Sequence, residues 1–183
     1  MARIAAPDLP GITALFAFRP ETAAPLGALA EALLRGPSPL SSADRETIAA
    51  VVSRGNDCEF CARSHSAAAA AHAGGNLERI RAACSDIDTA PISDKLKALL
   101  RVALQVRHSG KAVHDETVAA ARAVGVTDVE LHDTVLIAAA FCMFNRYVDG
   151  LQTSYSLDDA DYTEMGRMMA QEGYLEGKDA AGA

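Results

Sequence analysis

Apolar residues recur along most of the chain with the spacing of helices that bury one face. After Ser93, for example, Leu96, Leu99 and Ala103 follow at steps of three and four residues, which places them on one side of a helix. The sustained alternation of apolar and polar residues that is typical of half-buried strands is not seen, and alanine is frequent. The pattern therefore predicts an all-α fold.

Capping residues and glycines divide this pattern into separate helices. Ser93 and Asn76 are good N-cap residues, and Thr127 with Glu130 three positions later forms a capping box. Glycines such as Gly55 are expected just after a helix, where the left-handed conformation favours them. We expect helices at residues 22–35, 43–54, 58–73, 76–84, 93–108, 115–124, 127–148 and, in the tail, 158–173.

The chain is predicted to form a single domain over residues 1–183, because it contains no convincing linker and no long-period repeat. Within it we expect an extended N-terminal arm at residues 1–20, a core at about residues 40–150 and a frayed tail at residues 174–183. Half of the residues are hydrophobic and 22% are charged, which is enough apolar material to bury a core.

Charge and apolar runs narrow the possible partners. The formal net charge is −7 and lysines and arginines do not cluster, so nucleic acid is not an expected partner. The longest apolar run, residues 135–144, is too short for a membrane span and predicts a buried helix. The N-terminal apolar segment is short, follows two prolines and is not typical of a secretory signal. No membrane association is therefore expected.

The cysteine count points to a reducing compartment. Four cysteines in 183 residues do not make a disulfide-stapled secreted scaffold. We therefore expect a cytoplasmic protein, in which a closely spaced cysteine pair indicates catalysis or metal binding.

The stretch DCEFCARSHS contains such a pair, Cys58 and Cys61, followed by His65. The asparagine and aspartate before Cys58 are good N-cap residues, so Cys58 is expected in the first helical turn, where the helix dipole and free N–H groups favour a thiolate. The three side chains share one helix face. The imidazole could then exchange a proton with sulfur, and one thiol could resolve a sulfenic acid on the other into a disulfide.

Glu46 is the predicted partner of His65. If the two flanking helices form an antiparallel hairpin about Gly55-Asn56, Glu46 and His65 lie at equal distances from the turn and face each other. A carboxylate there would orient the imidazole and raise its basicity. The alternative is a solvated glutamate in the first helical turn, where the helix dipole favours a negative charge.

Two further interpretations of the motif remain open. Structural zinc usually needs four ligands, often as two pairs, but Cys84 and Cys142 stand alone in apolar surroundings. His72 lies about 21 Å along the helix from Cys58 at ~1.5 Å per residue. A metal site is therefore not expected, except as a bridge between subunits. The second interpretation is that both cysteines and His65 simply pack in a core.

Glu46, Cys58, Cys61 and His65 together resemble the signature of the AhpD-like family, which comprises alkylhydroperoxidase D and carboxymuconolactone decarboxylase proteins. The shared features are a glutamate twelve residues before the first cysteine, the CxxC pair, and a histidine four residues after the second cysteine. The sequence of this region and the later segment FNRYVDG are similar to those of the branch called uncharacterised peroxidase-related enzymes. The resemblance covers roughly residues 8–155.

The resemblance implies an all-α thiol peroxidase that needs no metal, haem or other cofactor and forms homo-oligomers, commonly trimers or hexamers, with a dimer also open. It implies that Cys61 attacks the hydroperoxide substrate and that Cys58 resolves the product. His65 and Glu46 would relay protons, and an external thiol or dithiol would act as reductant. Apolar faces on an alanine-rich chain are consistent with subunit contacts.

The chain departs from the family pattern at Phe60, since the best-studied members carry a relay histidine there. Decarboxylase members generally lack the cysteine pair, so that activity is disfavoured. The helix dipole favours Cys58 as the more acidic thiol while the resemblance favours Cys61, so the assignment stays open. The alternative functions are a thiol–disulfide redox sensor or reductase with little peroxidase activity, and a non-catalytic oligomeric binding protein. Asn145 and Arg146 are expected to tie helix ends together rather than to bind a carboxylate.

Overall fold

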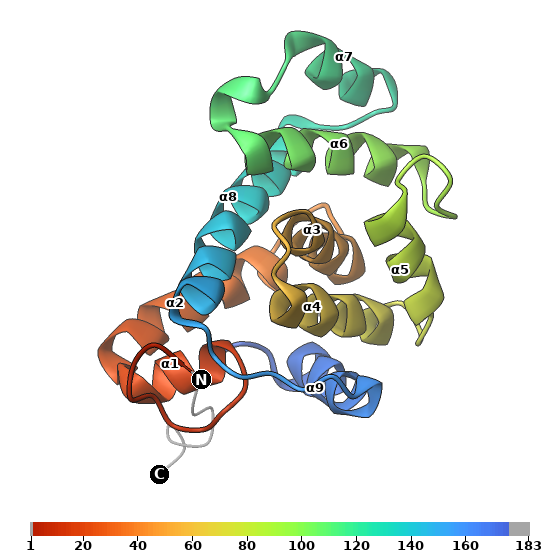
Figure 1. Cartoon of the computed structure of the whole chain (residues 1–183). Coiled ribbons are helices and arrows are strands. Elements are labelled where there is room, and N and C mark those ends of the chain that lie inside the picture. The colour runs from red at the N-terminus through yellow and green to blue at the C-terminus, as the bar shows by residue number, and fades with distance from the viewer. Residues whose placement is uncertain (1, 176–183) are drawn as a thin grey trace.

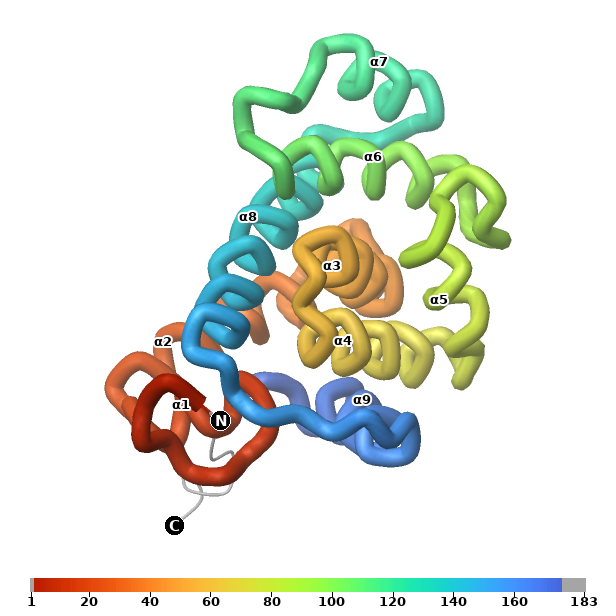
Figure 2. The backbone as a smooth tube through the Cα atoms, viewed as in Figure 1, coloured from red at the N-terminus to blue at the C-terminus, as the bar shows by residue number. Residues whose placement is uncertain are grey.

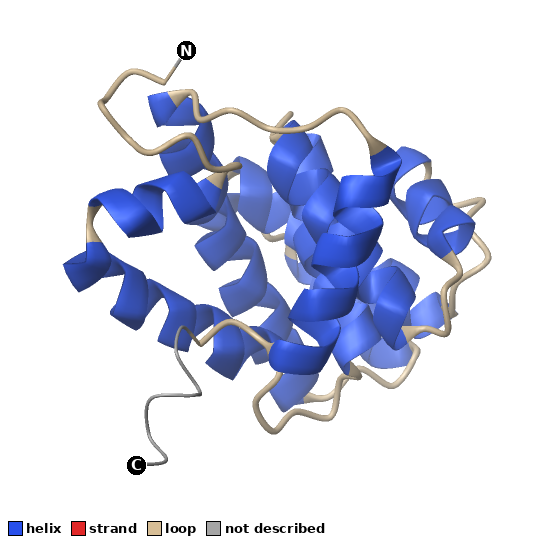
Figure 3. Cartoon of the chain, turned by 90° about the horizontal axis from the view of Figure 1, so that it is seen from below, coloured by secondary structure: helices blue, strands red, loops and turns tan. Residues whose placement is uncertain are grey.

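The computed structural model describes residues 2–175, and over these residues it is helical without strands, which confirms the all-α prediction (Figure 1; Figure 3). The elements are α1 Ile12–Phe18, α2 Pro20–Leu34, α3 Ser42–Gly55, α4 Glu59–His72, α5 Leu77–Ser85, α6 Asp94–His108, the 3₁₀ helix η1 Gly110–Ala112, α7 Asp115–Ala123, α8 Asp128–Leu151 and α9 Asp159–Glu172.

The helices begin at the capping residues that the sequence marks. The Ser93 side chain accepts a hydrogen bond from the Leu96 N–H, and the Asn76 side chain accepts one at the start of α5. Both halves of the capping box at Thr127 and Glu130 are formed. Each such cap satisfies backbone donors that the first helical turn leaves without a partner, so the predicted starts of α5, α6 and α8 are confirmed.

The hairpin of α3 and α4 lies at the centre of the molecule (Figure 2). Helices α6 and α8 pack against α3, whereas α9 packs along α4 (Figure 1). Helix α5 contacts both α3 and α4. The core between α3, α6 and α8 contains the fully buried side chains of Ile48, Val52, Leu99, Ile137 and Phe141. Burial of each such side chain contributes about 1.5–3 kcal/mol, so the central hairpin is held from several sides.

Helix α8 has apolar residues on more than its inner face. It is the one helix within residues 2–175 that is long and apolar enough, by length and composition alone, to cross a membrane, and 44% of its apolar window is buried inside the molecule. Phe141 and Phe144 pack in the core, as expected for the run at residues 135–144.

Asn145 on α8 contacts the end of α3. It donates to Ser53 Oγ at 2.9 Å and accepts from Asn56 Nδ2 at 2.9 Å. The predicted tie between helix ends is therefore confirmed for Asn145.

The N-terminal and C-terminal segments differ from the predictions. Residues 1–20 were expected to be extended, but they contain α1, and α2 begins at Pro20, whose fixed φ suits the first helical position. The tail was expected to fray from residue 174, but the Tyr174 N–H donates to Glu31 Oε2 at 2.9 Å. Residues 176–183 of that predicted tail lie outside the described residues, and the single-domain assignment stays a prediction.

Candidate active site

The turn between α3 and α4 places both cysteines of the motif in the interior. Asp57 adopts the left-handed conformation with φ 59°, and the Cys58 N–H returns to Ser53 O at 3.1 Å. Cys58 is itself the N-cap residue of α4, and its side chain forms no capping hydrogen bond. The prediction that it lies within the first turn behind an asparagine or aspartate cap is therefore wrong. Cys58 is 0% exposed and Cys61 is 4% exposed.

The surroundings of Cys58 keep its proton in place. A side-chain hydrogen bond with Cys61, followed by burial, raises the pKa of the Cys58 thiol far above its ordinary value. Asp149 on α8 also hydrogen-bonds with Cys58, and burial raises the pKa of that carboxyl. A helix end can favour a thiolate, but here the buried pair opposes ionisation of Cys58. The helix-dipole argument for Cys58 therefore stays a prediction, and the burial of this thiol opposes it.

Glu46 and His65 face each other across the hairpin, as the turn symmetry predicts. The Glu46 Oε2 to His65 Nδ1 distance is 2.7 Å. The Glu46 side chain is 0% exposed, so the alternative of a solvated first-turn glutamate is wrong. When Nδ1 of His65 carries the proton and donates a hydrogen bond to Glu46, Nε2 is free to accept a proton. The ring of His65 also packs edge-on against Phe141, with centroids 4.5 Å apart.

The second oxygen of Glu46 is bound by a residue that the sequence prediction missed. Tyr174 lies just after α9, and its hydroxyl donates to Glu46 Oε1 at 2.5 Å. Its ring is stacked against that of His65, with centroids 6.1 Å apart and planes at 17°. The available signal was weak: an aromatic and a leucine directly follow Gly173 at the end of the last helical pattern.

A cavity of about 400 Å³ brings Cys61 and His65 together. Apart from these two residues and Tyr174, its wall is largely apolar and comes from α1, α2, α4, α8 and α9, with side chains that include Ile12, Phe16, Leu26, Phe60, Phe141, Phe144, Met165, Met168, Met169 and Leu175. Phe60 packs against Tyr162 at a centroid distance of 6.3 Å, and a Cβ at Gly11 would overlap its ring. Phe60 is thus a packing residue, so the motif supplies His65 alone as an imidazole.

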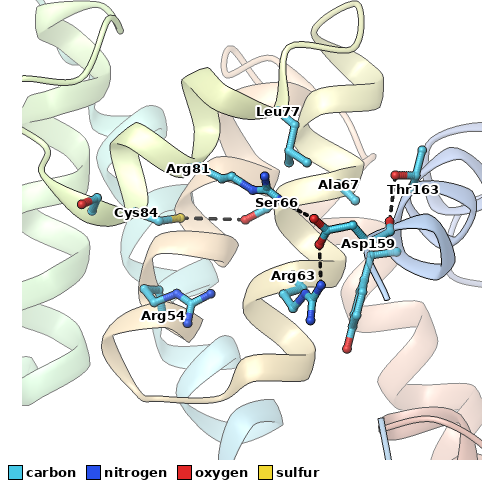
Figure 4. Close-up of a pocket in the computed structure, with 11 residues that line it drawn as sticks. Arg54, Arg63, Ser66, Ala67, Leu77, Arg81, Cys84, Asp159 and Thr163 are labelled. Atoms are coloured by element: carbon cyan, nitrogen blue, oxygen red, sulfur yellow. Dashed lines mark hydrogen bonds and ion pairs between the residues drawn. The ribbon is translucent and has the colours of Figure 1, made fainter. Parts of the chain in front are cut away.

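A second cavity of about 360 Å³ lies between α4, α5 and α9 (Figure 4). Asp159 bridges Arg63 and Arg81, bonding the latter at 2.9 Å. Arg54, also in the wall, pairs with Glu59 at 2.6 Å. The two Asp159 ion pairs join α9 to α4 and α5, the Arg54–Glu59 pair joins α3 to α4, and together they already neutralise the three guanidinium groups.

No three side chains of histidine, cysteine, aspartate or glutamate within residues 2–175 converge in a way that could hold a metal ion. Cys84 and Cys142 are free thiols outside the Cys58–Cys61 pair. Cys84 contacts Ser66 Oγ at 3.9 Å, and burial raises the pKa of its thiol. The expectation of a site without metal or cofactor stays a prediction.

The fold is that of the AhpD core. An uncharacterized peroxidase-related protein from Ralstonia eutropha JMP134, described as an alkylhydroperoxidase AhpD core, superposes with a TM-score of 0.76 and 25% identity over 87% of this chain and 82% of that chain. An uncharacterized peroxidase-related protein from Silicibacter sp. TM1040 gives a TM-score of 0.74 with 24% identity over 85% and 80% of the two chains.

The sequence comparison agrees with the fold. Residues 20–105 match the model of the carboxymuconolactone decarboxylase family, and this range includes Glu46, Cys58, Cys61 and His65. The resemblance predicted from the motif is therefore confirmed. No curated protein is significantly similar to the chain.

Proposed function

We propose that this protein is a thiol peroxidase that reduces hydroperoxides through the Cys58–Cys61 dithiol with a Glu46–His65 proton relay. The observation that carries the proposal is the buried Glu46–His65 hydrogen bond of 2.7 Å beside a cavity that also contains Cys61. The peroxidase-related proteins of the same fold support this class of activity.

Cys61 is the attacking thiol in this proposal. It lines the cavity, whereas Cys58 is fully buried behind it with a strongly raised pKa. His65 accepts the Cys61 proton at Nε2, while its Nδ1–H remains hydrogen-bonded to Glu46. The Cys61 thiolate then attacks the terminal oxygen of the hydroperoxide. An S–O bond forms, the O–O bond breaks, and the leaving alkoxide takes the proton from His65 to become an alcohol.

Cys58 completes the cycle as the resolving thiol. It attacks the sulfur of the Cys61 sulfenic acid: the S–S bond forms, the S–O bond breaks, and the Cys58 proton leaves with the hydroxyl group as water. An external thiol or dithiol returns the pair to the reduced state by thiol–disulfide exchange. The alternative function, a thiol–disulfide reductase or redox sensor, requires a partner's disulfide to reach these sulfurs. Their burial at 0% and 4% exposure favours a small hydroperoxide over a protein disulfide.

The proposal includes a homo-oligomer, a trimer or hexamer or else a dimer, in the cytoplasm. Val129, Leu136 and Met143 lie seven residues apart on α8 and are 52%, 41% and 43% exposed. Such spacing puts them on one side of the helix, and a second copy of the chain would remove this apolar stripe from water. This stripe, together with the inner face, gives α8 its membrane-like composition.

The test is the consumption of cumene hydroperoxide with dithiothreitol as reductant. We expect Cys61→Ser and Cys58→Ser to reduce turnover to the uncatalysed background, because one removes the nucleophile and the other the resolving thiol. Cys84→Ser, which alters a thiol outside the site, should retain full turnover. Unchanged turnover in both motif variants would refute the proposal. Slow peroxide reaction with fast disulfide exchange would establish the thiol–disulfide alternative.

A further inference from the structure

The two oxygens of the Glu46 carboxylate are bound by two different side chains. Oε2 is 2.7 Å from His65 Nδ1, and Oε1 accepts from the Tyr174 hydroxyl at 2.5 Å. Burial, followed by the Glu46 charge and hydrogen bond, raises the pKa of the Tyr174 hydroxyl, which therefore stays protonated as a donor. Glu46 itself has no exposed side-chain surface, so these contacts replace the hydration that the carboxylate loses on burial.

The position of Tyr174 is fixed by contacts with α2. Its N–H donates to Glu31 Oε2 at 2.9 Å, and Arg35 donates to the carbonyls of Met169 and Ala170, at 3.2 and 2.5 Å, at the end of α9. Gly173 adopts φ 85°, and a Cβ there would overlap Glu31 and lie 2.9 Å from Arg35 Nε. The end of α9 is thus anchored so that the tail delivers the phenol to Glu46.

A hydrogen bond to a buried carboxylate has a direct effect on the relay. Loss of the phenol donor would leave Oε1 buried without this partner, which penalises the charged form of Glu46. A less readily charged Glu46 would stabilise the His65 imidazolium less well. That imidazolium forms when Cys61 gives up its proton, so the Cys61 thiolate would form at higher pH.

Other charged groups surround this network. Arg45, next to Glu46 on α3, interacts with it electrostatically and donates to the carbonyls of Leu33 and Gly36. Arg35 acts electrostatically on Tyr174 and on His72, and Glu31 acts on Tyr174. Burial lowers the pKa of His72, which favours its neutral form. Tyr174 and His65 are the side chains that hydrogen-bond to Glu46 among the described residues.

We propose that Tyr174 is a positioning residue of the proton relay, whose hydroxyl binds Glu46 Oε1 and orients the carboxylate toward His65. It acts through Glu46 and does not touch the reacting sulfur. The proposal rests on the proposed function only in part, because the reactivity of Cys61 toward an alkylating reagent also depends on the relay and needs no peroxide.

The test compares Tyr174→Phe with wild type and with Tyr155→Phe, which removes the same atom from an exposed residue. The rate at which iodoacetamide alkylates Cys61 is measured against pH by peptide mass spectrometry. We expect the pH midpoint to rise by about one unit in Tyr174→Phe, because a hydrogen bond to a charged group is strong enough that its loss shifts a pKa by about one unit or more. The midpoint should stay unchanged in Tyr155→Phe. At a pH below both midpoints, alkylation should slow about tenfold.

The outcomes separate this proposal from the peroxidase proposal. If the midpoint shifts in Tyr174→Phe while the wild type consumes no hydroperoxide, the positioning role stands and the peroxidase proposal fails. If hydroperoxide is consumed but the Tyr174→Phe midpoint equals that of the wild type, the positioning role fails. A uniform loss of rate without a shift of the midpoint shows a merely structural effect of the tail and also overturns the proposal.

Discussion

Cys58 and Cys61 are three residues apart and both buried, yet their surroundings differ in chemically useful ways. Cys58 lies behind the cavity, hydrogen-bonded to Cys61 and to Asp149, and its pKa is strongly raised. Cys61 lies in the cavity wall with His65. A thiol that keeps its proton is a poor nucleophile toward the hydroperoxide, so in the proposed mechanism Cys61 reacts first and Cys58 reacts only with the sulfenic acid that then forms beside it.

Tyr162 is a single residue whose titration makes the stability of the fold depend on pH. Burial raises the pKa of its hydroxyl to about 12, so the folded state keeps this proton at pH values where the unfolded chain, with an ordinary phenol pKa of about 10, loses it. The contribution is fully present below pH ~10 and is lost as pH rises from ~10 toward ~12. The free energy of unfolding should therefore fall in that window by about 1.4 kcal/mol per pH unit from this group.

Urea unfolding at several pH values measures the slope. Tyr162→Phe lacks the titrating group, so its free energy of unfolding should fall less steeply between pH ~10 and ~12. It should be lower than that of the wild type at neutral pH, because the hydrogen bond from Tyr162 to Ser156 O is lost. Equal slopes for both proteins would contradict the assigned pKa.

At the scale of elements, the hairpin of α3 and α4 could be predicted because its geometry is local. The turn symmetry about Gly55-Asn56 was sufficient to pair Glu46 with His65. The helix start was less predictable: Asn56 and Asp57 have good N-cap side chains, but the left-handed Asp57 and the bond from Cys58 N–H to Ser53 O shift the cap to Cys58. Cap preferences are weaker here than the backbone conformation and the local hydrogen bond of the turn.

The role of Tyr174 could not be predicted, because its contacts connect residues that are far apart in sequence. Its partner Glu46 is 128 positions away, and Glu31 is 143 positions away. A short segment next to a charged tail is ordinarily typical of fraying. What fixes it is the anchoring of the end of α9 by Arg35 and Glu31, which no local pattern reveals.

The packing of α9 on α4 depends on a small residue at their crossing. A Cβ at Gly166 would lie 2.6 Å from Ala67 Cβ and 2.7 Å from Ala68 N, so Gly166→Ala must push the helices apart. We expect the free energy of unfolding to fall by about 1–3 kcal/mol, as for other overpacked sites. Since α9 carries three methionines of the cavity wall, hydroperoxide turnover should also fall.

Gly150→Ala is the matched control, because a Cβ there meets nothing within 4 Å. Its unfolding free energy should be unchanged or slightly raised, since alanine favours a helix over glycine. Urea denaturation of both variants measures the difference. Equal stability of Gly166→Ala and Gly150→Ala would show that the α4–α9 crossing is not tightly packed.

At the scale of the whole molecule, six helices contribute to one relay and its cavity. Helix α3 carries Glu46, α4 carries Cys61 and His65, and α1, α2, α8 and α9 enclose the apolar cavity beside them. The segment after α9 adds Tyr174, whose hydroxyl donates to Glu46. The central claim is that this enclosed dithiol converts one hydroperoxide to an alcohol in each oxidation.

The mass of the intact protein after reaction with one equivalent of hydroperoxide, without reductant, tests that claim most directly. The account predicts that the reduced wild type loses about 2 Da as a Cys58–Cys61 disulfide forms, with stoichiometric release of alcohol. It predicts that Cys58→Ser instead gains about 16 Da at Cys61 as a sulfenic acid. An unchanged mass in both proteins, or oxidation at Cys84 or Cys142 in place of this pair, would contradict it.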